Sequence, residues 1–292
     1  MDHFTRELIV LNHCRGVGRK MIWRLLQRDP NLIRFRNYST RDIQQFFHLS
    51  QAKATIFVDD LHQLDANKLL SMLHAQQITP ISFQHSSYPK LLKHIFDPPY
   101  LIYAKGNVSL LNETKMLSVV GTRHPSREAL QIINKIVVPL IKSGWTIVSG
   151  MAMGIDGMAH QQALAHQTIA VLGSGLNHPY PRQNHFLFKQ MCAAQLVISE
   201  YPPDARPERW RFPERNRIIS GMTLGTLVIE AKEKSGSLIT ADQALDQGRD
   251  VFAVPGSIFK ETCGGTHRLI QQGAKLVCDW QDIIQELNWR ME

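Results

Sequence analysis

Between about residue 113 and its end, the chain alternates short apolar runs with longer amphipathic ones, and this alternation constrains the fold more than any other feature. The apolar runs have the length of strands and are nearly continuous, as strands buried on both faces of a sheet should be. Alternating strands and helices predict βαβ units and a mostly parallel sheet covered by helices on both faces. We expect strands at residues 116–120, 146–149, 168–172, 196–199, 227–230, 251–254 and 274–278. We expect helices at residues 126–143, 155–165, 184–192, 215–222, 237–247 and 266–272.

Small residues follow almost every predicted strand. One strand is followed by Gly121-Thr122-Arg123, and the next ends in Ser149-Gly150 and resumes as a helix after two more glycines. Glycine lets an anion approach the backbone, and a helix N-terminus points N–H groups at it. Taken alone, residues 149–160 are compatible with two alternatives, a phosphate-binding loop and a tight turn that binds no ligand. In parallel sheets, ligands bind outside the carboxyl ends of the strands, so the whole set of ends predicts a ligand-binding rim.

The rim lacks the signatures of the common nucleotide sites. A dinucleotide site needs Gly-x-Gly-x-x-Gly after its first strand, and the Gly173-x-Gly175 turn lacks the third glycine. No Gly-x-x-x-x-Gly-Lys-Ser/Thr motif occurs, which argues against P-loop nucleotide hydrolysis. The motifs therefore argue against a dinucleotide site and against a P-loop site.

Residues 201–220 combine basic and aromatic side chains. The segment holds five arginines against three acids, interleaved with Tyr201, Trp210 and Phe212. Arginine binds phosphate in bidentate fashion, and aromatic rings between basic groups can stack on bases. A solvated loop with ion pairs such as Glu214 with Arg217 is the alternative.

The N-terminal region predicts a small helical domain. Gly16-Val17-Gly18 separates two helical runs, which resembles a helix-hairpin-helix element, with Arg15, Arg19 and Lys20 placed to contact a phosphate. In the alternative, these glycines only make a turn within a small bundle. We predict a helical SAM-like or helix-hairpin-helix-like domain at 1–80, a connecting segment at 81–112 that joins the sheet edge, and an α/β domain at 113–292.

The composition indicates what kind of partner the chain binds and in which compartment it acts. The net charge of +8 and pI near 9.4 favour a polyanionic partner such as nucleic acid. Four widely spaced cysteines make a zinc site or a disulfide framework unlikely and fit a reducing cytoplasm. We expect no signal peptide and no membrane span, because no apolar run reaches the roughly 20 residues that a span needs.

An ordered series of motifs resembles the DNA-processing protein A (DprA/Smf) family over about residues 100–278. The series consists of Gly121-Thr122-Arg123, Ser149-Gly150-Met151-Ala152-Met153-Gly154-Ile155-Asp156, Tyr180-Pro181-Arg182-Gln183-Asn184, Ser199-Glu200-Tyr201-Pro202, Phe212-Pro213-Glu214-Arg215-Asn216-Arg217, Ser235-Gly236-Ser237, Gly248-Arg249-Asp250 and Gly264-Gly265-Thr266.

The resemblance implies an extended Rossmann-like domain that binds single-stranded DNA without a nucleotide cofactor. It further implies that the chain loads RecA recombinase onto DNA during natural transformation, forms a homodimer through this domain and is not an enzyme. Many members carry a C-terminal winged-helix-like domain. The chain ends about fourteen residues after Cys278, so we expect that module to be absent.

The resemblance and the residue chemistry together predict a DNA-binding set without catalytic or metal-binding members. Arg123 is expected to bind a phosphate. Helical residues two apart point about 200° apart, so only one of Arg215 and Arg217 should face the pocket, while the other pairs with an acid. The predicted DNA-binding residues are Gly121, Thr122, Arg123, Ser149, Gly150, Arg182, Arg215, Asn216 and Arg217.

Three titratable residues near this set are expected to be structural. We interpret Asp156 as a residue that supports a helix start and Glu230 as a carboxylate that orients an arginine. We expect His160 to be a packed histidine and not a ligand.

An enzyme is the competing class. Rossmann-like phosphoribohydrolases place Pro-Gly-Gly-x-Gly-Thr before an acidic residue, and this chain keeps Gly225-Thr226 and the later Glu230 but lacks the preceding Pro-Gly-Gly. Release of a base from nucleoside monophosphates, lost in Glu230→Gln, would identify that class.

Overall fold

The computed structural model describes residues 1–288 of the chain. The chain folds into two compact units, each with more contacts within itself than with the other. The first unit comprises residues 1–85 and 99–103. The second comprises residues 86–98 and the chain from residue 104 onward.

The first unit is mainly helical. It contains α1 (His3–His13), α2 (Arg19–Arg28), η1 (Phe35–Asn37), α3 (Thr40–Phe47), α4 (Gln51–Gln63), α5 (Ala66–Ala75) and the strand β1 (Thr79–Ser82). Its helices begin at the polar caps that the sequence offers: Asp2 accepts the N–H of Thr5 at 2.8 Å, and Ser39 forms a capping box with Asp42.

The core of the first unit is aliphatic and aromatic, and ion pairs border it. Buried members of this core are Leu8, Ile9, Leu11, Leu25, Phe35, Ile43, Phe57 and Leu61. Arg15 binds Asp60 at 2.7 Å, and Arg36 binds Glu7 at 2.6 Å. These two pairs connect α4 to the loop before α2 and α1 to η1.

The second unit alternates strands and helices. Its strands are β3 (Met116–Val120), β4 (Thr146–Ser149), β5 (Thr168–Leu172), β6 (Leu196–Ser199), β7 (Gly225–Val228), β8 (Asp250–Ala253) and β9 (Lys275–Leu276). Its longer helices are α7 (Ala129–Lys142), α8 (Ile155–Ala163), α9 (His185–Ala194), α10 (Arg211–Gly221), α11 (Gly236–Asp246), α12 (Gly264–Gln271) and α13 (Trp280–Asn288). The short elements are α6 (Lys90–Lys93), η2 (Val108–Asn112), η3 (Arg182–Asn184) and η4 (Glu261–Cys263).

The strands form a mostly parallel sheet. Within the second unit the strand order is β6-β5-β4-β3-β7-β8-β9, and β2 (Leu101–Gly106) has residues in both units. The pairs from β6 through β3 to β9 are all parallel. Strand order reverses at β3, which pairs with β4 on one side and β7 on the other. The predicted α/β, Rossmann-like fold is confirmed. Its topological switch point lies at the carboxyl ends of the neighbouring strands β3 and β7.

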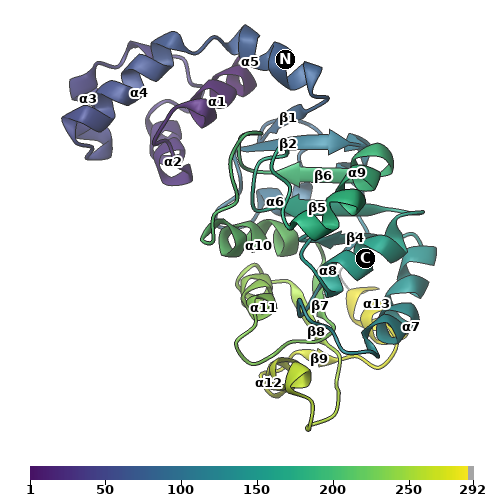
Figure 1. Cartoon of the computed structure of the whole chain (residues 1–292). Coiled ribbons are helices and arrows are strands. Elements are labelled where there is room, and N and C mark those ends of the chain that lie inside the picture. The colour runs from purple at the N-terminus through teal and green to yellow at the C-terminus, as the bar shows by residue number, and fades with distance from the viewer. Residues whose placement is uncertain (289–292) are drawn as a thin grey trace. The chain divides into compact units, whose positions relative to one another are not determined.

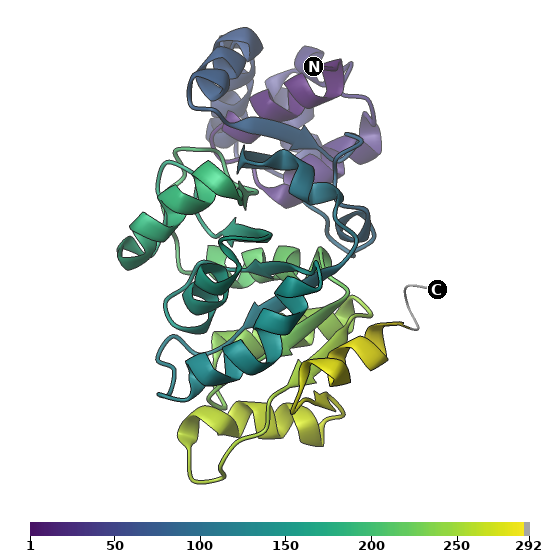
Figure 2. The ribbon, with the colours of Figure 1, turned by 90° about the vertical axis from the view of Figure 1, so that its right-hand side faces the viewer.

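Helices cover both faces of this sheet. In Figure 1, α10 and α11 lie on one face, and α7, α8 and α13 lie on the other. Figure 2, viewed from the side, shows α7 and α13 on the face turned toward the reader. Because both faces are covered, most strand residues are buried, which explains their continuous apolar sequences.

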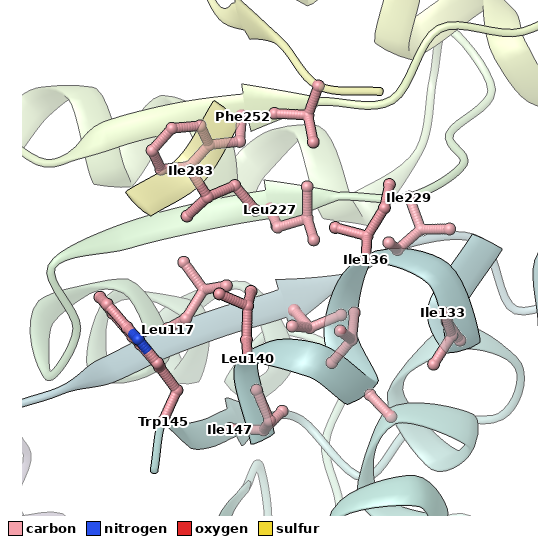
Figure 3. Close-up of a cluster of buried hydrophobic side chains, with 14 of the residues drawn as sticks. Leu117, Ile133, Ile136, Leu140, Trp145, Ile147, Leu227, Ile229, Phe252 and Ile283 are labelled. Carbon is pink, nitrogen blue, oxygen red and sulfur yellow. The ribbon is translucent and has the colours of Figure 1, made fainter. Parts of the chain in front are cut away.

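A layer of buried apolar side chains lies between α7 and the central strands. In Figure 3, Leu140 of α7 lies beside Leu117 of β3, and Ile136 of α7 lies near Leu227 of β7. Trp145 and Ile283 belong to the same cluster. Packing of this kind fixes the carboxyl ends of β3 and β7 relative to each other.

The structure differs from the sequence predictions at several places. The strand expected at 227–230 begins and ends two residues earlier, and the strand expected at 274–278 has only two residues. The helix expected at 215–222 begins one turn earlier, at Arg211, because Pro213 falls in the first turn, where proline costs no hydrogen bond. The helix α13, which the sequence analysis did not predict, follows β9 and buries Ile283 and Leu287. Within residues 1–288, no helix is long and apolar enough to cross a membrane.

Candidate nucleic-acid interface

A cleft of about 830 Å³ opens at the carboxyl ends of β3 and β7, beside the topological switch point. It belongs entirely to the second unit. Its walls are the loop after β3, the start of α10, and the loop that leads from β7 into α11. The lining residues are Val120, Gly121, Thr122, Arg123, His124, Ala152, Asp156, Tyr180, Arg209, Phe212, Pro213, Arg215, Asn216, Ile219, Lys232, Lys234, Ser235, Gly236, Ser237, Ile239 and Thr240.

The loop after β3 is held by backbone contacts and leaves Arg123 exposed. The N–H of Thr122 donates to the carbonyl of Glu230 at 2.7 Å, which joins this loop to the end of β7. A Cβ at Gly121 would lie 2.6 Å from the side chain of Ile155, so only glycine fits there. Arg123 is exposed at the rim, in the position predicted from the sequence.

Three further cations stand at the rim of the cleft with Arg123. Arg209, Lys232 and Lys234 are exposed, and of these Lys232 pairs with Glu261 at 2.6 Å. Within residues 1–288, no ion pair engages Arg123, Arg209 or Lys234. The rim therefore offers open positive charge to a ligand.

Two aromatic rings flank the cleft. The ring centroids of Tyr180 and Phe212 are 5.4 Å apart with planes tilted by 45°, and Tyr180 is 45% exposed. A Cβ at Gly173 would lie 2.7 Å from Phe212, so glycine at the end of β5 gives this ring its space. A smaller cavity of about 100 Å³ is lined by Arg123 and by both rings. The arrangement offers flat apolar surface beside the cations.

The side chain of Arg215 is buried beneath the cleft and joins neighbouring elements. It is 5% exposed, and its guanidinium donates to the carbonyl of Gly150 at 2.5 Å and to the carbonyl of Val171. A Cβ at Gly150 would lie 2.6 Å from that guanidinium, so the glycine makes room for the arginine. Burial lowers the pKa of Arg215 to about 10, with Asp156 acting in the opposite direction. The group stays charged at neutral pH.

Asp156 supports the floor of the cleft. Its carboxylate accepts the N–H groups of Gly150 at 3.1 Å and of Ala152 at 3.3 Å. Burial raises its pKa, while Arg215 and the two backbone donors lower it. The interpretation of Asp156 as a structural residue agrees with these contacts.

The structure places four of the predicted residues outside the cleft lining, and one of them, Gly150, lines the smaller cavity instead. Ser149 is buried and donates to the carbonyl of Val119 at 2.6 Å, so it has no hydroxyl proton left for a phosphate. Arg182 is exposed on η3, outside the lining. Arg217 binds Glu200 at 2.7 Å and approaches Asp97 at 3.7 Å, so it is the arginine of the pair that meets acids.

Asn216 and Gly150 have structural roles at the cleft. The Asn216 amide donates to the carbonyl of Gly236 at 3.3 Å and accepts from the Nε of Arg215 at 3.1 Å, which ties α10 to the start of α11. Gly150 lies under Arg215 and lines the smaller cavity.

The role expected of Glu230 is wrong. Its carboxylate accepts the backbone N–H of Ser126 at 2.9 Å and the Ser126 hydroxyl, and no arginine among residues 1–288 binds it. It therefore holds the segment that leads into α7. The expectation for His160 is met: the ring is fully buried, and its Nδ1 lies 2.7 Å from the Thr168 hydroxyl.

The sequence analysis did not identify Lys232 and Lys234 as rim residues. They stand just before Ser235-Gly236-Ser237, which is part of the motif series, and a Lys-x-Lys pair beside such a turn is a usable signal. Among residues 1–288, no group of three or more His, Cys, Asp or Glu side chains is placed to hold a metal ion.

The chain resembles known proteins over most of its length. Residues 79–288 match the family described as DNA recombination-mediator protein A. The DNA processing protein DprA of Bacillus subtilis is 43% identical over 252 residues, which make up 85% of each chain.

Two solved structures are similar to this one. The crystal structure of DNA processing protein A from Streptococcus pneumoniae superposes with a TM-score of 0.85 at 37% identity, covering 98% of this chain and 99% of the other. A structure of DNA processing protein A from Helicobacter pylori, described as giving insight into its single-stranded DNA binding mode, has a TM-score of 0.66 at 29% identity and covers 73% of this chain and 97% of the other.

Proposed function

We propose that this chain, which belongs to the DNA recombination-mediator protein A family, binds single-stranded DNA in the cleft beside β3 and β7. The observation that carries the proposal is the rim itself. Arg123, Arg209 and Lys234 stand exposed and unpaired within residues 1–288, next to the rings of Tyr180 and Phe212.

A strand of nucleic acid suits this combination of groups. Guanidinium and ammonium groups neutralise phosphates, and aromatic faces stack on bases without selecting among them. A single strand presents both its phosphates and its unstacked bases, whereas a duplex keeps its bases stacked inside. The name given to the Helicobacter pylori structure supports the same ligand, since that relative shares the fold.

The predicted residues take different roles in this proposal. Arg123 binds a phosphate directly, and Gly121 and Thr122 hold the loop that presents it. Asn216, Gly150 and Arg215 keep α10 and the floor of the cleft in place, and the buried charge of Arg215 adds positive potential beneath the strand. Ser149, Arg182 and Arg217 have no direct contact with the DNA in this cleft.

The test compares two arginines of one loop. Arg123→Ala removes a rim cation, whereas Arg127→Ala removes an exposed arginine that does not line the cleft. Binding of an oligothymidylate is measured at several salt concentrations by fluorescence anisotropy. We expect Arg123→Ala to weaken binding and to reduce the log–log salt slope by about 0.7, the value for one phosphate contact on a single strand.

Other sequences of single strand should lose affinity in the same proportion, because a phosphate contact carries no base information. Arg127→Ala should behave as the wild type. Equal slopes and affinities for Arg123→Ala and the wild type would show that the DNA lies elsewhere.

The family resemblance also supports the wider role proposed here. The chain would act in the cytoplasm as a homodimer that delivers single strands to RecA recombinase during natural transformation. The assay is RecA-dependent ATP hydrolysis on DNA coated with single-strand-binding protein. The chain should shorten the lag before hydrolysis, and an unchanged lag would leave only the DNA-binding part of the proposal.

We favour a binding module over a nucleotide-cleaving enzyme because of what surrounds Glu230. Its carboxylate is 3% exposed and engaged by Ser126, which leaves it poorly placed to act on a substrate in the cleft. Nucleoside monophosphates incubated with the chain should remain intact. Turnover that disappears in Glu230→Gln would favour the enzyme.

A further inference from the structure

We infer that the first unit carries a second nucleic-acid surface, on the exposed face of α2, separate from the cleft of the second unit. The observation that points to it is the distribution of charge along the chain. Residues 15–41 contain eight Lys and Arg residues and one acid, a net of +7, while the whole chain carries +8. The basic charge of the first unit is thus concentrated in this stretch, because the unit as a whole carries a net charge of only +4.

The single acid in that stretch does not offset the charge at the surface. Asp29 is 5% exposed, and its carboxylate accepts the backbone N–H groups of Ile33, Arg34 and Phe35 at 2.6–3.0 Å. Two of the basic residues are also engaged, since Arg15 binds Asp60 and Arg36 binds Glu7.

The basic residues without an ion pair include a row along α2, of which Arg28 stands over the ring of Phe46, 4.1 Å from its centroid. The exposed residues of the row are Lys20, Trp23, Arg24, Gln27 and Arg28, which recur at the spacing of one helix face. Within residues 1–288, no ion pair engages the three basic residues of this row. Successive charges stand four residues apart, about 6 Å along the helix axis. Such a row suits a ligand whose negative charge repeats along its length.

An aromatic ring stands within the row. Trp23 is 51% exposed, between Lys20 and Arg24 on the same face. A solvent-facing indole among cations is the arrangement that stacks on an unpaired base while its neighbours bind the flanking phosphates. Because a duplex has no free base face, the surface fits a single strand best.

A lipid surface fits α2 less well. A helix that lies in a membrane interface buries its apolar face in lipid. The apolar residues Ile22 and Leu25 of α2 are already buried in the first unit, with exposures of 7% and 1%. The helix has only its charged face to offer.

The test uses the full chain with two charge reversals, Lys20→Glu and Arg24→Glu together. The matched control is Lys53→Glu with Lys68→Glu, which reverses two exposed lysines of α4 and α5 in the same unit. For a long oligothymidylate, we expect the α2 variant to lose about 1.4 from its log–log salt slope, the value for two contacts. Over a tenfold range of salt, this slope change corresponds to a loss of affinity of about 25-fold. The control should lose much less.

A second measurement locates the strand. An oligothymidylate that carries a photoreactive halouracil is cross-linked to the chain and the adduct is mapped by mass spectrometry. We expect an adduct on Trp23, which persists in Arg123→Ala and is lost in the α2 variant. No adduct in α2, together with equal salt slopes for the α2 variant and its control, would overturn the inference without touching the cleft.

The variants test the proposed cleft site and the proposed surface on α2 independently. If Arg123→Ala changes nothing while the α2 variant loses affinity, the cleft proposal fails and the surface on α2 stands. In a separate experiment, binding of the chain to vesicles of phosphatidylserine and phosphatidylcholine is measured. Binding to vesicles that depends on Lys20 and Arg24, with DNA affinity equal to that of the control, would assign α2 to membranes and overturn the inference.

Discussion

At the scale of single residues, burial decides which of the arginines can meet a ligand. Arg215 and Arg217 stand two residues apart on α10, and both are buried, at 5% and 7% exposure. One binds backbone carbonyls and the other binds Glu200. Helix geometry correctly separated the two, but no sequence pattern distinguishes an arginine that binds a carbonyl from one that binds a phosphate. Arg123, on an exposed loop, is the one of the three arginines that is open to a ligand, and its contact with a phosphate stays a prediction.

His160 makes the stability of the chain depend on pH. Burial lowers its pKa from 6.5 to about 3. Between these values the unfolded chain binds a proton that the folded chain does not, so stability falls as the pH falls below 6.5, by about 1.4 kcal/mol per pH unit from this residue. Urea unfolding at pH 7.5 and 5.0 should show the loss in the wild type and a smaller loss in His160→Gln. The matched control is His166→Gln, at an exposed histidine, and an equal loss in both variants would contradict the assignment.

At the scale of elements, the sequence predicted strands better than helix ends. The predictions for β3, β4, β5 and β6 match the structure residue for residue, because buried parallel strands are continuous apolar runs with sharp limits. The helix α13 has apolar residues at Trp280, Ile283, Ile284 and Leu287, at helical spacing, and could have been predicted from them. The hydrogen bonds of Glu230 with Ser126 could not, because they join residues about a hundred positions apart.

Arg215 ties three elements together, and Gly150 permits it to do so. The guanidinium reaches from α10 to carbonyls at the ends of β4 and β5. Gly150→Ala would place a methyl group against a buried group that cannot move without losing those bonds. We expect a loss of about 1–3 kcal/mol in the free energy of unfolding, measured by urea titration.

Gly236→Ala is the control, because nothing lies within 4 Å of the added methyl group. Its stability should stay within about 0.5 kcal/mol of the wild type. If Gly150→Ala is as stable as that control, Arg215 does not fix these elements.

At the scale of the whole molecule, the fold follows from the alternation of strands and helices, and the place of the cleft follows from the fold. A parallel sheet that reverses its strand order leaves a gap at the reversal, and the motif Gly121-Thr122-Arg123 stands there. The relative weight of the two units in binding DNA does not follow from sequence patterns, because it depends on how many of the basic residues are engaged by acids.

A homodimer would present two clefts to one strand. Two linked sites bind a long strand with higher avidity than one site binds a short one. We expect sedimentation at micromolar concentration to find a dimer, and we expect affinity to rise steeply once an oligothymidylate is long enough to reach both clefts. A monomer whose affinity rises only gradually with length would contradict the dimer.

The central claim is that the cleft beside β3 and β7 holds a single strand of DNA. The most direct measurement is a crystal structure of the full chain with a short oligothymidylate. We expect a phosphate within hydrogen-bond distance of the Arg123 guanidinium and a base near Tyr180 and Phe212. A strand bound elsewhere, with the cleft open to solvent, would contradict it.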